Sequence, residues 1–579
     1  MTKSLEKNGL DKIRFLIILS FIIAGLFLKA YFITLIPINQ DEFHYLSFVH
    51  SFNRGEPVSV YQTFHSYLFS WLWIVGNNEV DQVIAARTVM FMFLCGTCVC
   101  LFFLARHFHG KSAALFLVVC YISFTFVIIN GASFRPDTIA VFLCMLALCL
   151  FMIRGDSSWA NVLVGVLTAL SCMFTIKTSI YLVLFILLAL IRLHFSRYSL
   201  RSLKHTIYGG ISFIVSFIAA YSIHASTHAR MAEVTDRASY LGNAFSTFFT
   251  FREIFPGWKY FPAALQMNVF IWALLAFGFF LYVFNVIKKS HVLHREDVYL
   301  IVMFTPLLSL LVYRNSFPYY FAFITPPLTL FCGYTFHRFI LIESQRDKRW
   351  TVIITFILTL VVFFNFVLSE SYLFRTGRRI ISHQRNVLIE IHRIFPEPVP
   401  YIDGCNMIAS YPQVAFFMST AGMKGYLNLK HPIFEDILFN KKPLLLLANV
   451  PHLDLTRKTP PASSAGLTMT NKDWIALRSH FIHHWGQVWV LGKQFNAGAK
   501  KLRENFDITV PGVYTLEANA VVAIDGRQFS PGDVIQLEQR THTLEAKEAT
   551  GIIKLRWGSH LYRPHTQPGS ETLFMGIFG

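Results

Sequence analysis

The sequence has 579 residues, of which 54% are hydrophobic and only 15% are charged. A soluble protein of this length needs more charge to cover its surface, so the composition favours a protein of the lipid bilayer. Much of the formal net charge of +18 falls in short clusters between apolar runs, which is typical of cytoplasmic loops, and we expect no nucleic-acid partner.

Apolar runs long enough to cross a bilayer recur up to residue 369 and predict about eleven transmembrane helices. The basic N-terminus precedes a first run with no small-residue cleavage site, so we expect this run to remain as an uncleaved helix. The predicted helices cover residues 13–36, 83–105, 112–131, 137–153, 159–175, 177–193, 207–224, 263–287, 298–313, 319–341 and 351–369.

The basic clusters predict the orientation of these helices. Counting eleven runs places four basic clusters on the same side as the basic N-terminus, at residues 106–111, 192–205, 288–295 and 346–349. The N-terminus is then cytoplasmic and the C-terminus extracytoplasmic, and the bacterial inner membrane is the expected location. Two long loops face outward, at residues 37–82 and 225–262, and basic and aromatic residues in the second predict a helix at the membrane surface.

The composition changes near residue 370, which divides the chain into a transmembrane domain (1–369) and an extracytoplasmic domain (370–579). Residues 385–505 indicate mixed α and β structure. Alternating apolar and polar residues, with turns at Asp525-Gly526 and at residues 531–533, predict a β-rich module at about 510–560. The expected fold is a polytopic α-helical membrane protein with a C-terminal α/β and β-sandwich region.

Charged residues at the outer ends of membrane helices are costly, and they mark functional sites. Carboxylates that face cations are what a site for an anionic substrate with a general base requires. The candidates are Asp41, Glu42, Arg135, Asp137, Lys177 and Arg314.

Each candidate also has a structural explanation. Asp41-Glu42 could be a solvated acid pair at a helix end, and Asp137 after Pro136 could serve only as a helix cap. Lys177 could extend to the membrane interface or bind a phosphate. His65 in the first outer loop is more often a structural residue.

Cysteine and histidine patterns give little evidence for disulfides or metals. Eight of the nine cysteines lie in apolar runs and Cys405 stands apart, so no disulfide framework is expected. His480, His483 and His484 lack a clear fourth zinc ligand.

The ordered set of motifs over about residues 13–340 resembles the GT-C class of membrane glycosyltransferases. The similarity is to the branch of protein O-mannosyltransferases and bacterial lipid A aminoarabinose transferases. The matching pieces, in chain order, are Asp41-Glu42 with Tyr45, the Arg135-Pro136-Asp137 segment, Lys177, and the stretch from Arg314 through Tyr319 and Tyr320 to Pro326-Pro327.

The resemblance implies transfer of a sugar from a polyprenyl phosphate to an acceptor hydroxyl of a lipid, glycan or protein outside the cytoplasm, with inversion. Asp41 would be the general base on the acceptor or would orient it, with Glu42 beside it, and Asp137 would assist at the sugar or acceptor. Lys177 and Arg314 would hold the phosphate, and Tyr319 or Tyr320 would donate a hydrogen bond to it. Such an enzyme would serve protein glycosylation or cell-envelope synthesis. No cofactor is expected, although Asp41, Glu42 and Asp137 could bind a divalent metal.

One position departs from the family pattern. Relatives often carry a Lys-Pro segment in the first outer loop, where this chain has Phe64-His65-Ser66, so His65 would have to contact the phosphate instead. Two other functions compete with transfer: transport of a lipid-linked anion, and membrane anchoring of a non-catalytic outer domain. Charges gathered at one membrane face disfavour transport.

Overall fold

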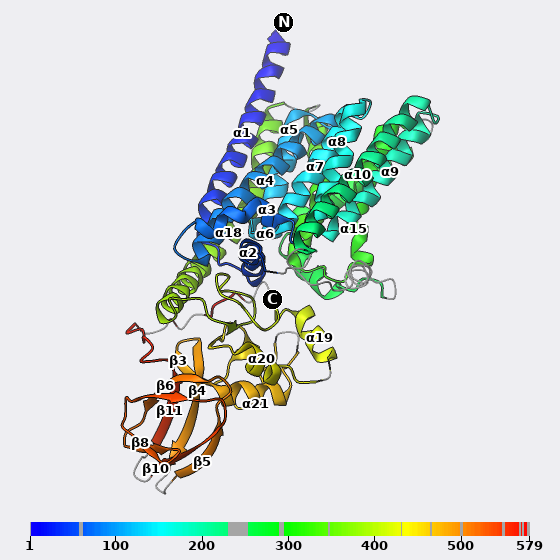
Figure 1. Ribbon diagram of the computed structural model, residues 1–579. Coiled ribbons are helices and arrows are strands. Elements are labelled where there is room, and N and C mark those ends of the chain that lie inside the picture. The colour runs from blue at the N-terminus through cyan, green and yellow to red at the C-terminus, as the bar shows by residue number, and fades with distance from the viewer. Residues whose placement is uncertain are drawn as a thin grey trace. The chain divides into compact units, whose positions relative to one another are not determined.

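The computed structural model describes residues 2–56, 62–229, 253–288, 294–344, 348–429, 431–463, 466–497, 502–546, 551–566, 569 and 572–575 (Figure 1). The chain forms two compact units. The first, here the helical unit, comprises residues 1–36, 51–72 and 84–376. The second, here the mixed unit, comprises residues 37–50, 73–83 and 377–579. The predicted first outer loop is therefore divided between the two units.

Helices make up the described part of the helical unit, and some of them continue into the mixed unit. α7 and α8 pack against each other and run side by side in Figure 1. The helices up to residue 229 are α1 (Thr2–Phe32), α2 (Gln40–Asn53), α3 (His65–Phe69), η1 (Ser70–Ile74), α4 (Glu79–Phe108), α5 (Lys111–Ile122), α6 (Thr125–Asn130), α7 (Pro136–Arg154), α8 (Ser158–Phe174), η2 (Ile176–Thr178), α9 (Ser179–Phe195) and α10 (Leu200–Ala229). Those that follow are η3 (Trp258–Tyr260), α12 (Phe261–Gln266), α13 (Val269–Lys288), α14 (Arg295–Val302), α15 (Thr305–Leu308), η4 (Ser309–Leu311), α16 (Pro318–Leu328), α17 (Leu330–Ser344) and α18 (Lys348–Ile394).

Seven helices in the described part of the chain are long and apolar enough to cross a membrane, which makes the chain an integral membrane protein. They are Leu10–Phe32, Glu79–Phe108, Pro136–Arg154, Ile176–Phe195, Leu200–Thr227, Val269–Lys288 and Arg349–Ser369. The polytopic helical fold is confirmed. The count of eleven remains a prediction, because the other apolar runs form shorter or interrupted helices. Residues 230–252 of the second outer loop, where a surface helix was expected, lie outside the described residues.

The break between α5 and α6 shows how an apolar run is interrupted. The Asn268 side chain accepts a hydrogen bond from the Thr125 backbone nitrogen at 2.8 Å, and the Asn365 side chain donates to the Ser123 carbonyl at 2.9 Å. Backbone groups freed within an apolar layer must find partners inside the protein. Two asparagines from later helices supply them here.

Close helix packing positions the segments that carry the candidate residues. α8 packs against α7 and α10, and a Cβ atom at Gly165 of α8 would lie 2.3 Å from the Gly209 carbonyl oxygen of α10. Small residues permit such approaches between membrane helices. α16 packs against α6 and α7, which brings its first turn to the start of α7.

The mixed unit contains two sheets, drawn from yellow to red in Figure 1. Its strands are β1 (Tyr401–Ile402), β2 (Leu445–Leu447), β3 (Phe481–Trp485), β4 (Val488–Ala497), β5 (Leu502–Asp507), β6 (Gly512–Glu517), β7 (Val522–Ile524), β8 (Arg527–Phe529), β9 (Val534–Leu537), β10 (Thr541–Ala546) and β11 (Gly551–Trp557). Its other helices are α19 (Thr420–Asn428), α20 (Phe434–Lys441), η5 (Pro451–Leu453) and α21 (Asn471–His480).

The seven-stranded sheet has the order β1-β2-β4-β11-β6-β9, with β3 also paired to β4, and the four-stranded sheet has the order β5-β10-β7-β8. Only the β1–β2 pair is parallel among the named strands of the described residues. Buried side chains of both sheets, such as Leu516 and Leu544, share one hydrophobic core. The predicted strand-rich C-terminal region is therefore confirmed.

A two-residue hairpin joins β7 to β8, with Ile524 opposite Arg527. Asp525 and Gly526 have φ values of 50° and 81°, the left-handed conformation that such tight turns require. The Asp-Gly turn predicted from the sequence is present at this position.

Candidate functional site

Three charged side chains of the helical unit form a compact group, here the charged triad: Arg135, Asp137 and Lys177. Arg135 precedes α7, Pro136 occupies its first turn, and Asp137 follows, while Lys177 lies in η2 between α8 and α9. The Lys177 Nζ atom is 2.6 Å from Asp137 Oδ2, and Arg135 Nε is 3.6 Å from the same oxygen. The side chains are 6%, 13% and 6% exposed for Arg135, Asp137 and Lys177. The carboxylate of Asp137 therefore pairs with two largely buried cations.

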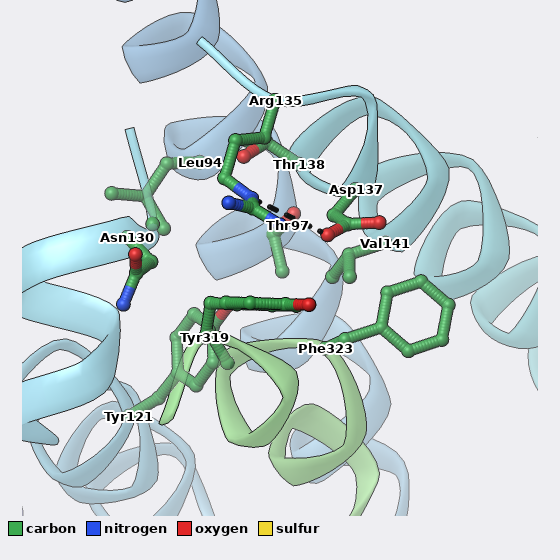
Figure 2. Close-up of a pocket in the computed structure, with 12 residues that line it drawn as sticks. Leu94, Thr97, Tyr121, Asn130, Arg135, Asp137, Thr138, Val141, Tyr319 and Phe323 are labelled. Atoms are coloured by element: carbon green, nitrogen blue, oxygen red, sulfur yellow. Dashed lines mark ion pairs between the residues drawn. The ribbon is translucent and has the colours of Figure 1, made fainter. Parts of the chain in front are cut away.

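Tyr319 provides an aromatic platform for both cations. The Arg135 guanidinium carbon is 3.8 Å from the centre of the Tyr319 ring, and Lys177 Nζ is 4.5 Å from it. Figure 2 shows the guanidinium above the face of the ring, beside Asp137. The ring face attracts cations because it carries partial negative charge. Pro318 starts α16 and sets Tyr319 in its first turn, where it meets the start of α7.

A small pocket opens beside the triad (Figure 2). Its space of about 20 Å³ is enough for about one water molecule. The lining residues are Leu94, Thr97, Tyr121, Asn130, Gly131, Arg135, Asp137, Thr138, Val141, Tyr319, Ala322 and Phe323. Thr97, Tyr121 and Asn130 line the pocket but are not among the candidates named from the sequence. Asn130 had a visible signal, since it is an amide at the end of an otherwise apolar run.

Tyr320 and Arg314 lie apart from this pocket's lining. The Tyr320 hydroxyl is 2.5 Å from Ser309 Oγ, and its ring stacks on Tyr313 with the ring centres 4.2 Å apart. Tyr320 is fully buried, whereas Arg314 is exposed in the turn before α16. The two neighbouring tyrosines therefore have different environments, and Tyr319 is the one that meets the triad.

His65 is buried and packs against the residue that precedes Arg135. Its Nδ1 atom is 3.1 Å from the Gln62 carbonyl oxygen, and its ring lies against Phe134, with the ring centres 5.8 Å apart. The preceding Phe64 contacts Phe174 at the end of α8. The start of α3 and the residue before it thus pack against the segments that lead into Arg135 and Lys177.

The acidic pair Asp41-Glu42 belongs to the mixed unit and begins α2. Glu42 is fully buried, and its carboxylate accepts a hydrogen bond from the Asn39 backbone nitrogen at 3.1 Å. The Asn39 side chain accepts one in return from the Glu42 nitrogen at 3.0 Å. This reciprocal pair is a capping box. Asp41 is half-buried, and Tyr45 lies one turn further along, with its ring near His44 and Phe48.

Glu42 thus has a clear structural task at the helix start, which distinguishes it from Asp41. Asp41 remains the stronger candidate for proton transfer. Its place in the first turn of α2 also suits a negative charge, because helix N-termini carry partial positive charge.

No group of three histidine, cysteine, aspartate or glutamate side chains that could hold a metal ion occurs in the described ranges. His480, His483 and His484 bond separately to Thr509 Oγ1, the Gly486 carbonyl and the Tyr562 carbonyl. All nine cysteines are free thiols.

No model of a known protein family matches the sequence, and neither does any curated protein. Solved structures do match. ArnT from Cupriavidus metallidurans bound to undecaprenyl phosphate has 12% identity and a TM-score of 0.51, over 74% of this chain and 92% of that one. The apo oligosaccharyltransferase of Archaeoglobus fulgidus has 10% identity and a TM-score of 0.55, over 95% of this chain and 98% of that one. The Archaeoglobus fulgidus enzyme AglB, in complex with an inhibitory peptide and a dolichol-phosphate, has 10% identity and a TM-score of 0.52. The match covers 91% of this chain and 93% of that one.

These proteins are GT-C glycosyltransferases. The chain has the GT-C fold. The resemblance drawn from the sequence motifs is therefore confirmed at the level of fold.

Proposed function

We propose that this GT-C protein is a glycosyltransferase that moves a sugar from a polyprenyl-phosphate carrier to an acceptor hydroxyl on the extracytoplasmic face. Solved structures with the same fold hold undecaprenyl phosphate or dolichol-phosphate, which supports a lipid-linked donor. The observation that carries the proposal is the buried charged triad on Tyr319. Buried charged groups within membrane helices are costly, and they mark functional sites.

The donor side of the reaction needs positive charge where the phosphate departs. We assign Arg135 and Lys177 to this task, with Arg314 as a further cation from the turn before α16. Asp137 holds both cations in place through its single carboxylate, so its proposed role is to orient them. The Tyr319 ring lies against both cations, and His65 packs on Phe134, the residue before Arg135.

The acceptor side needs a base. Asp41 is assigned to accept the proton of the acceptor hydroxyl while its oxygen bonds to the anomeric carbon. The bond from that carbon to the phosphate oxygen breaks, and polyprenyl phosphate leaves with the bonding electrons. A single displacement of this kind inverts the anomeric centre. Tyr45 lies one turn from Asp41 and would contact the acceptor, which is a lipid, a glycan or a protein.

The test is donor turnover by protein reconstituted in vesicles made from the host's total membrane extract, which supplies both the polyprenyl-phosphate-linked sugar and the acceptors. Lys177→Met removes one cation of the triad and keeps an unbranched side chain. Loss of one group that stabilises developing charge costs about 10²–10³ in rate, so release of polyprenyl phosphate should fall by about that factor. Lys111→Met, at the exposed first residue of α5, is the matched control and should behave like the wild type.

An unchanged rate in Lys177→Met would remove Lys177 from the phosphate role. Wild-type protein that moves the intact lipid-linked sugar across the bilayer, without cleaving it, would instead identify a transporter. Full activity in the presence of a chelator is expected, because no step of the proposed reaction needs a metal.

A further inference from the structure

Helix α2, which carries Asp41, is held in place by residues from much later in the chain. Its segment up to His50 belongs to the mixed unit. Residues of α18, of the chain that follows β1 and of the C-terminal segment contact this part of α2 or the residues just before it. The hydrogen-bonded pairs are 346 and 359 positions apart in the sequence. Three of these residues, Gln384, Asn406 and Phe417, are here called the clamp.

Gln384 holds the backbone just before α2. Its side chain is fully buried in α18, and its Oε1 atom accepts a hydrogen bond from the Ile38 nitrogen at 3.1 Å. Its Nε2 atom donates to the Ile38 carbonyl at 2.7 Å and to the Leu573 carbonyl at 2.7 Å. One amide therefore bonds both polar groups of a single residue, which fixes the point where the chain enters the helix.

Asn406 holds the helix further along. Its Nδ2 atom donates to Ser47 Oγ at 3.0 Å. Asn406 itself has a φ of 60°, a conformation that asparagine and glycine adopt more readily than other residues.

The loop that presents Asn406 is itself fixed by a buried carboxylate. Asp403 accepts hydrogen bonds from the backbone nitrogens of Cys405, Asn406 and Met407 at 3.2, 2.8 and 2.7 Å. The Asn449 side chain donates to the same carboxylate at 2.9 Å. The bond to Ser47 therefore comes from a rigid support.

Phe417 packs on the part of α2 between these two points. Its ring stacks on His44, with 4.3 Å between ring centres and 19° between ring planes. On the same helix, Phe43 contacts Phe574 of the C-terminal segment, with the ring centres 6.2 Å apart. The helix is thus held at its start, in its first turns and at Ser47, and Asp41 lies within that stretch.

The Asp403 loop also lies close to Asp41 itself. Burial raises the pKa of the Cys405 thiol, and the negative charges of Asp403 and Asp41 raise it further.

We infer that Gln384, Asn406 and Phe417 are positioning residues, which hold Asp41 in the geometry that proton transfer from the acceptor requires. This inference rests on the proposed function, because it takes Asp41 as the base. Displacing a reacting group by about 1 Å can cost about 10² in rate, so a helix held at several points has direct value for catalysis. The region beyond residue 377 would then be part of the catalytic machinery.

The test uses full-length protein in vesicles made from the host's total membrane extract, which supplies donor and acceptors, and it measures release of polyprenyl phosphate. Asn406→Gly removes the bond to Ser47 and still permits the left-handed φ, and Ser47→Ala removes the same bond from the other side. Each should lower kcat about 10-fold and leave the donor KM within about twofold. The double variant should be no slower than either single variant, because both changes remove one interaction. Gln528→Ala, on the exposed face of β8, is the control and should match the wild type.

Phe417 gives an independent readout by rescue. Phe417→Leu removes the stacking on His44 and should lower kcat, whereas Phe417→Tyr keeps the ring and should restore it. A role limited to stability would lower the thermal midpoint and the active fraction in all variants, but it would leave the kcat of the folded protein unchanged. That outcome would overturn the inference.

Failure of the inference is distinct from failure of the proposed function. Asp41→Asn could be inactive while Asn406→Gly, Ser47→Ala and Gln384→Ala keep the wild-type kcat. The positioning role of the clamp would then be wrong, and the assignment of Asp41 as the base would stand. If Asp41→Asn is fully active, the base assignment itself is wrong. Should Gln384→Ala fail to fold, the Asn406 and Ser47 variants decide, because each removes a single hydrogen bond.

Discussion

At the scale of residues, two cations share one carboxylate and one aromatic ring. The charges of Arg135, Asp137 and Lys177 could be found in the sequence, because charged residues stand out within apolar runs. The choice between Tyr319 and Tyr320 could not, since adjacent residues point to different sides of a helix and only the packing of α16 decides which one meets the cations. The burial of His65 and the exposure of Arg314 also depend on packing.

The Tyr319 ring, rather than its hydroxyl, should matter most for the triad. We expect Tyr319→Phe to retain most of the transfer rate, because the ring face lies 3.8 Å from the Arg135 guanidinium carbon. Tyr319→Leu should lose cation–π contacts worth about 0.5–2 kcal/mol, a rate loss of up to about 30-fold. Donor turnover of the two variants measures the difference. A large loss in Tyr319→Phe would show instead that the hydroxyl contacts the phosphate.

At the scale of elements, α2 begins with the capping box formed by Asn39 and Glu42. The sequence placed both acids of the Asp41-Glu42 pair among the catalytic candidates, but it could not separate them. The hydrogen bonds give Glu42 a structural role, and Asp41 is the acid that we propose for proton transfer. The interrupted apolar run at α5 and α6 is another limit at this scale, since Asn268 and Asn365 complete the break from distant helices.

Glu42→Gln should retain both stability and activity, because a glutamine side chain still accepts the bond from the Asn39 nitrogen. Glu42→Ala should remove the box and lower stability by roughly 1 kcal/mol. Thermal unfolding of the purified variants, together with donor turnover, measures both effects. Loss of turnover in a stable Glu42→Gln protein would restore Glu42 to the list of catalytic acids.

At the scale of the whole molecule, residues 37–50 and 73–83 belong to the mixed unit although they lie between membrane helices in the sequence. Composition divided the chain near residue 370 because charge and turn residues begin there. It could not reveal that earlier segments join the later region, since hydrogen bonds such as those of Gln384 and Asn406 leave no local pattern. The GT-C fold could be inferred because its motifs occur in order along the chain.

A histidine in the mixed unit should make the stability of the protein depend on pH. The His392 Nε2 atom is 3.1 Å from Glu79, and its Nδ1 atom is 3.2 Å from the Tyr411 hydroxyl. Burial lowers the pKa of His392, but the hydrogen bond to Glu79 and the charge of Glu79 together raise it above its ordinary value of 6.5.

Because the pKa is raised in the folded protein, the stabilisation is fully present below about pH 6.5 and is lost as the pH rises through the folded value. We expect the thermal midpoint of the wild type to fall as the pH increases above 6.5, and His392→Gln to lack this part of the dependence. Thermal unfolding across that range measures it. Equal pH dependence in both proteins would contradict the assigned pair.

The central claim is sugar transfer from a polyprenyl phosphate with Asp41 as the base. The most direct measurement is mass spectrometry of the lipid products formed by wild-type and Asp41→Asn protein in vesicles made from the host's total membrane extract, which supplies both the polyprenyl-phosphate-linked sugar and the acceptors. We expect the wild type to release polyprenyl phosphate and Asp41→Asn to fold normally but turn over about 10²–10⁴ times more slowly. Equal release by the two proteins, or no release by the wild type, would contradict the account.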